Sequence, residues 1–144
     1  MTSWKVDGKE KLFLSSKAVL DGSKAIRGGI PVVFPNFGPW ELGPQHGFAR
    51  ILPWNVAHQT ESSVTLSLEP CKKTREMWDF SFKLEYTGEE NVNPFKESDQ
   101  FVVRIDESSL YTIMTVENTD QKAFDFTALL HTYLHVDIKT MRGN

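Results

Sequence analysis

The side chains best suited to chemistry gather in one irregular stretch, residues 27–50, which reads RGGIPVVFPNFGPWELGPQHGFAR. It begins with Arg27 and ends with Arg50, and it contains the neighbouring pair Gln45 and His46. The guanidinium group is a planar set of donors that matches the oxygens of phosphate or carboxylate. The stretch is therefore interpreted as an anion-binding loop. The alternative is that both arginines pair with Asp or Glu and only brace the loop.

A second group with chemical potential is the sequence HTYLHV, in which His131, Tyr133 and His135 occupy alternate positions. Imidazole titrates near neutral pH, so a histidine can act as a general acid or base. In a strand these three side chains would share one polar face, which would suit a sugar. The alternative is a solvated outer face with two ordinary histidines. His131 and His135 would lie roughly 13 Å apart along a strand, too far to share one zinc ion, so no metal site is predicted.

The stretch 27–50 must be held in place by packing, because its sequence has no helical or strand period. Five Gly and four Pro interrupt any helical or strand period. A solvated tract would nevertheless carry far fewer apolar residues, and long loops in compact domains are usually binding loops or disordered. We therefore predict a packed, stiff loop that presents Arg27, Gln45, His46 and Arg50. Its apolar residues are Ile30, Val32, Val33, Phe34, Phe37, Trp40 and Phe48.

The rest of the chain predicts short strands joined by polar turns. Apolar and polar residues alternate in VTLSL and again from Phe80 to Tyr86, as in strands with one buried face. Asp7–Gly8 is a hairpin turn signal, 72–77 is the one plausible helical turn, and 87–100 and 118–122 read as polar loop and turn. In the last strand, even positions from Phe124 to Val136 should face the core. Strands are expected at 54–58, 64–68, 80–86, 101–105, 110–117 and 123–136, which together predict an antiparallel all-β sandwich in a single domain, residues 1–144.

Composition excludes several classes of function. The chain has 144 residues, 40% of them hydrophobic, and a net charge of −3 without a basic tract. These values allow one real core and argue against nucleic acid or a membrane surface as the partner. No apolar run reaches the ~20 residues of a membrane span, and the first residues lack the features of a secretory signal. Cys71 is the only cysteine and has no base beside it, so we expect no disulfide, no thiol nucleophile and a reducing, cytoplasmic location.

Several strings resemble the aldose-1-epimerase superfamily, and in particular its hexose-6-phosphate mutarotase (glucose-6-phosphate 1-epimerase) branch. They occur in the family's order: TSWK, LFLSSKA, AIRGGIPVVFPNFG, GPQHGFAR, WDFSFKLEY and FDFTALLHTYLHV. The resemblance implies a β-sandwich of the galactose mutarotase-like (supersandwich) type that interconverts the α and β anomers of glucose 6-phosphate, without a metal or organic cofactor. It also implies that His131 is the catalytic acid, that Gln45 binds substrate, that Arg27 and Arg50 bind phosphate, and that His46 lies beside them facing the sugar.

The chain departs from the family pattern at the general base. The family uses a Glu well downstream of the catalytic His, whereas here the last glutamate is Glu117 and Asp137 follows His131 too closely along the strand. We therefore expect a sandwich incomplete at both ends, resembling about the middle half of a full enzyme. The alternative function is an inactive carbohydrate-phosphate binding module or fragment that lacks the base. Unpaired sheet edges in such a chain would favour self-association.

Overall fold

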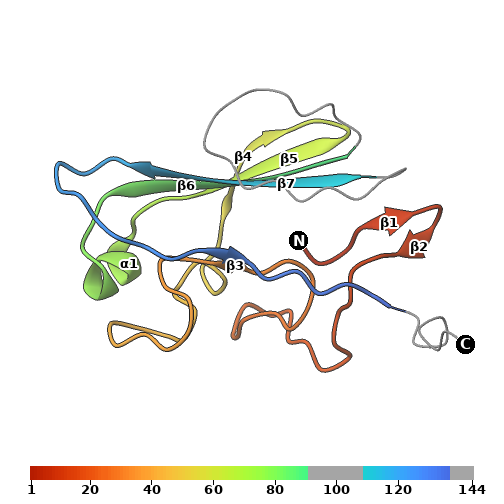
Figure 1. The fold of residues 1–144 in the computed structure, drawn as a ribbon, viewed down its shortest axis with the longest axis horizontal. Helices are drawn as coiled ribbons and strands as arrows, with labels where there is room; N and C mark the ends of the chain where they lie inside the picture. Colours follow the sequence, from red (N-terminus) through yellow and green to blue (C-terminus); the bar gives the residue numbers. More distant parts are fainter. Residues whose placement is uncertain (91–108, 137–144) are drawn as a thin grey trace, which may run out of the picture.

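The computed structural model describes residues 1–90 and 109–136, and nearly all regular structure in them is β (Figure 1). Every strand pair within these ranges is antiparallel, and the one helix there is short, which confirms the predicted all-β class. No helix in the described residues is long and apolar enough to cross a membrane. The elements are β1 (Lys5–Val6), β2 (Lys9–Glu10), β3 (Val32–Val33), β4 (Asn55–Gln59), β5 (Ser63–Leu68), α1 (Lys72–Met77), β6 (Phe82–Glu90), β7 (Leu110–Asn118) and β8 (Leu129–Leu130).

The largest sheet has four strands in the order β4-β5-β6-β7. Its central strand β6 buries Phe82, Leu84 and Tyr86 on one face, as the alternating pattern predicted. Pairing with β7 carries β6 on to Glu90, so residues 87–90, predicted as part of a polar loop, belong to the strand. The cause is tertiary, because the polar residues 87–90 find backbone partners in 110–113. The rest of the predicted loop, 91–100, and the predicted strand 101–105 lie outside the described residues.

The stretch 27–50 packs against this sheet as the second layer of the sandwich. Figure 1 shows β3 on one side of the four-stranded sheet, and β3 pairs there with β8. Phe34 and Phe48 of the stretch are fully buried, with their ring centroids 5.4 and 5.8 Å from that of Phe82 on β6. Trp78, just after α1, closes the same aromatic cluster. The predicted packed loop is thus confirmed, except that Val32–Val33 form a short strand within it.

The prediction of one continuous strand over 123–136 is wrong. Only Leu129–Leu130 form a strand, and single hydrogen bonds join the remainder to two different neighbours, residues 29–35 and residues 11–13. The predicted core face is also only partly buried: Phe124 and Leu130 pack against the core, whereas Phe126, Leu134 and Val136 are 43%, 48% and 49% exposed. Alternation tells which residues share a face, but a face is buried only where another layer covers it. In the described part of the chain, no layer fully covers these three.

Candidate functional site

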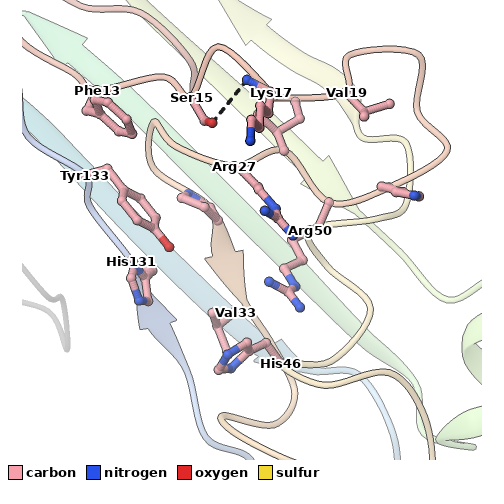
Figure 2. Close-up of a pocket in the computed structure, with 14 residues that line it drawn as sticks. Phe13, Ser15, Lys17, Val19, Arg27, Val33, His46, Arg50, His131 and Tyr133 are labelled. Atoms are coloured by element: carbon pink, nitrogen blue, oxygen red, sulfur yellow. Dashed lines mark hydrogen bonds between the residues drawn. The ribbon is translucent and has the colours of Figure 1, made fainter.

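A cavity of about 560 Å³ brings together four of the five predicted site residues. Arg27, His46, Arg50 and His131 line it, although they are up to 104 positions apart in the sequence. Figure 2 shows their side chains around one hollow, with His131 on a different side from the arginines. The fifth, Gln45, is exposed and does not line the cavity. It contributes through its backbone carbonyl, which accepts a 2.7 Å hydrogen bond from Nη2 of Arg50.

His131 is positioned by backbone pairing with the stretch 27–50. Val32 and Val33 pair with Leu130 and Leu129, and the His131 amide donates to the carbonyl of Pro31 at 3.1 Å. The imidazole then stacks on the ring of Tyr133, with centroids 4.6 Å apart and an interplanar angle of 26°. Both rings line the cavity, so the predicted polar face forms a wall of the candidate site. His135, the third residue of that face, is exposed and does not line it.

His46 is held by a small hydrogen-bonded ring of backbone and side chain. It has a positive φ of 68°, its amide donates to the carbonyl of Gly38 at 2.9 Å, and its Nδ1 accepts from the Gly38 amide at 3.0 Å. Because Nδ1 is an acceptor, the proton of the neutral imidazole is on Nε2. Partial burial first, and then the positive charges of Arg50 and His131, lower the pKa of His46 below its usual value. At neutral pH His46 is therefore an uncharged hydrogen-bond donor.

The two arginines are available to a ligand. In the described part of the chain the ion pairs are Lys72–Glu76, Arg75–Asp79 and Lys83–Glu85, so neither Arg27 nor Arg50 is braced by a carboxylate there. Nε of Arg50 is buried and has no hydrogen-bond partner among the described residues. A buried N–H group without a partner costs free energy, and a ligand oxygen could satisfy it. This geometry favours the anion-binding interpretation over the bracing one.

Sequence reasoning missed nine of the 14 residues that line the cavity. The segment 15–27 folds back on itself, because the Ser15 amide donates to the carbonyl of Arg27 at 3.0 Å and Leu14 forms a bridge with Gly28. We call this segment the lysine loop. The sequence SSKAVLDGSKAIR contains two lysines that could have indicated an anion site. Their spacing of seven residues, however, does not predict that they lie close together. These nine residues are Phe13, Ser15, Lys17, Val19, Lys24, Ala25, Ile26, Pro31 and Val33.

The charges around the cavity all have one sign. Its lining contains the basic side chains Lys17, Lys24, Arg27 and Arg50, and no Asp or Glu among the described residues. The described part of the chain contains no cluster of three or more His, Cys, Asp or Glu residues that could hold a metal ion. A cavity with aromatic and imidazole groups on one side and cations on another can bind a polar ring that carries an anion.

Comparison with known proteins gives a consistent result. The family model described as aldose 1-epimerase matches residues 1–143. A protein of Cenchrus ciliaris named "Putative glucose-6-phosphate 1-epimerase" is 36% identical over 153 residues, covering 99% of this chain and 43% of the relative. A protein of the same name from Escherichia coli K12 is 40% identical over 91 residues, covering 58% of this chain and 31% of the relative. The chain thus spans less than half the length of these curated relatives.

Solved structures agree with the sequence relatives. The crystal structure titled as a putative mutarotase (YeaD) from Salmonella typhimurium has a TM-score of 0.52 at 30% identity, over 76% of this chain and 41% of that one. The Slr1438 protein from Synechocystis sp. PCC 6803 has a TM-score of 0.55 at 32% identity, over 61% of this chain and 35% of that one. Together with the match over residues 1–143, these likenesses show that the chain belongs to the aldose 1-epimerase family.

Proposed function

We propose that this chain takes part in interconverting the α and β anomers of glucose 6-phosphate, holding the sugar phosphate and supplying the acid. One observation carries the proposal: His131 shares a single cavity with two arginines that have no carboxylate partner in the described residues. An acid beside an anion anchor is the arrangement that a phosphorylated sugar requires. The family match and the names of the relatives support the same reaction class.

In the proposed mechanism, Arg27 and Arg50 anchor the phosphate and so fix the sugar ring in the cavity. His131 gives a proton to the ring oxygen, while a base removes the proton from the anomeric hydroxyl. The bond between the anomeric carbon and the ring oxygen breaks, and an open-chain aldehyde forms. Rotation of the aldehyde followed by closure, with the proton transfers reversed, yields the other anomer. His46, neutral and protonated on Nε2, donates a hydrogen bond to a sugar oxygen. Gln45, predicted to bind substrate, serves here through its backbone carbonyl, which holds the guanidinium group of Arg50.

The second candidate function is a phosphosugar-binding module without catalysis. The observation that favours it is the lack of any Asp or Glu among the described lining residues, because the reaction needs a base as well as an acid. His46 is a poor replacement, since its Nδ1 already accepts the Gly38 amide and its Nε2 carries the proton. Both candidate functions therefore predict binding of the sugar phosphate, but only the first predicts faster exchange of its anomers.

Two-dimensional exchange NMR on the anomers of glucose 6-phosphate separates them. The purified chain should accelerate exchange over buffer, and His131→Ala should reduce the acceleration by about 10²- to 10⁴-fold. His58→Ala is the matched control, because His58 is exposed on β4 and does not line the cavity. Exchange at the buffer rate in a folded sample that binds the sugar phosphate would favour the binding module. A folded sample that neither binds nor accelerates exchange would refute both candidates.

A further inference from the structure

We propose that Lys17 and Lys24 of the lysine loop are specificity-determining residues that make the cavity select phosphorylated sugars over neutral ones. Neither residue was among the predicted site residues, and both line the cavity with the two arginines. The inference rests on the proposed function for the identity of the ligand. It concerns binding alone, so it can be tested whether or not the chain catalyses anomer exchange.

The fold of the lysine loop brings Lys17 and Lys24 to the lining of one cavity. Hydrogen bonds from the Lys17 amide to Oγ of Ser15, at 3.2 Å, and from the Ala18 amide to the Ser15 carbonyl, at 2.9 Å, start a turn directly after the loop's base. Gly22, with a positive φ of 79°, reverses the chain again before Lys24. The loop therefore leaves the base, turns and returns to it, so that both of its ends line the cavity.

The one acidic residue of the loop does not neutralise these lysines. Asp21 accepts a 2.9 Å hydrogen bond from the Ser23 amide, and hydrogen bonding with Ser23 lowers the pKa of its carboxyl group below the usual value. Asp21 is exposed and is absent from the cavity lining. Lys17 and Lys24 also take no part in the ion pairs of residues 1–90 and 109–136. Among the described residues, no carboxylate therefore neutralises the charges that the two lysines bring to the cavity lining.

The charge balance decides which ligand the cavity favours. Four basic side chains line it without a carboxylate among the described residues, so a neutral hexose would leave their mutual repulsion unchanged. A phosphate monoester carries about −1.5 to −2 charges at neutral pH, which two guanidinium groups can already balance. The lysines add a further attractive field on flexible stems, as compact point charges rather than planar forks. They should raise affinity and capture of the anion, while the arginines set its orientation.

The lysines can be changed without disturbing the acid. Figure 2 shows Lys17 on a different side of the cavity from His131 and Tyr133. Both lysines are exposed, so replacing them with glutamine removes charge without creating an internal cavity. Lys5 and Lys9, exposed on β1 and β2 and absent from the lining, provide a double control with the same change in net charge.

NMR titration of the full chain with inorganic phosphate, glucose 6-phosphate and glucose tests the proposal. The double variant Lys17→Gln/Lys24→Gln should weaken binding of both phosphates by about 1.4- to 5-fold per lysine, the range measured for exposed charge pairs. Its affinity for glucose should not change, and the loss should shrink as ionic strength rises. Lys17→Arg/Lys24→Arg should retain phosphate affinity, and Lys5→Gln/Lys9→Gln should match the unmodified chain.

Three results would overturn the proposal. They are equal phosphate affinity in the two double glutamine variants, a parallel loss of glucose affinity in Lys17→Gln/Lys24→Gln, and no phosphate binding by the unmodified chain. A failure of the proposed reaction has a different signature. In that case anomer exchange stays at the buffer rate, while phosphate binding still depends on the two lysines.

Discussion

Replacing Gly47 by alanine should destabilise the loop that carries His46 and Arg50. Gly47 has a positive φ of 72°, a conformation that L-residues with a side chain rarely adopt. An added Cβ would meet the backbone of the facing segment, 2.5 Å from the carbonyl carbon of Phe34 and 2.8 Å from the nitrogen of Pro35. Because these are backbone atoms, a side-chain rotation cannot relieve the contact.

The cost can be estimated from the contacts that must shift. The left-handed conformation costs about 1–2 kcal/mol with a side chain present. The carbonyl oxygen of Phe34 accepts hydrogen bonds from the amides of Phe48 and Ala49, at 3.0 and 3.2 Å, and each is worth about 0.5–1.5 kcal/mol. Losing both brings the total to about 3 kcal/mol. For a domain near this size each kcal/mol lowers Tm by about 3 °C, so Gly47→Ala should lower Tm by about 10 °C.

Thermal unfolding followed by circular dichroism measures this shift, and Gly38→Ala is the matched control. Gly38 lies in the same loop with a positive φ of 89°, but an added Cβ there would meet no atom within 4 Å. Its substitution should cost only the conformational part, about 1–2 kcal/mol. The difference between the two variants isolates the close approach of the backbones. Equal shifts in Tm would refute the reasoning.

Two further predictions concern the core and the imidazole beside the cavity. Phe48→Ala should lower the free energy of unfolding in urea by about 3–5 kcal/mol, because it empties a fully buried site. Phe37→Ala is the control and should change this free energy little, because Phe37 is 53% exposed. The pKa of His46 is lowered in the folded chain, so as pH falls the unfolded chain takes up a proton on this imidazole first. The contribution of neutral His46 to folding stability is therefore complete above pH ~6.5 and is lost as pH falls through the folded-state pKa. In an NMR titration Arg50→Gln should raise that pKa, and an unchanged value would contradict the electrostatic cause.

Much of the fold was predictable because local patterns and tertiary structure agree. The alternation of Phe82, Leu84 and Tyr86 identified the buried face of β6, and Asp7–Gly8 identified the turn between β1 and β2. The apolar content of 27–50 predicted a packed loop, which Phe34 and Phe48 confirm. Where they disagreed, as in 123–136, the pattern predicted one strand with a core face, but only Leu129–Leu130 form a strand and Phe126, Leu134 and Val136 are exposed.

The sequence by itself determined which chemical groups were available to a site. Two arginines can bind an anion, and two histidines can donate or accept a proton. Only the tertiary structure decided which of these groups meet. His131 lines the same cavity as His46 and Arg50 because β8 pairs with β3. Lys17 and Lys24 line this cavity too, because a hydrogen bond between Ser15 and Arg27 closes the lysine loop. Contacts of this kind depend on hydrogen bonds between backbone segments that are distant in the sequence. A local pattern of residues cannot predict such hydrogen bonds.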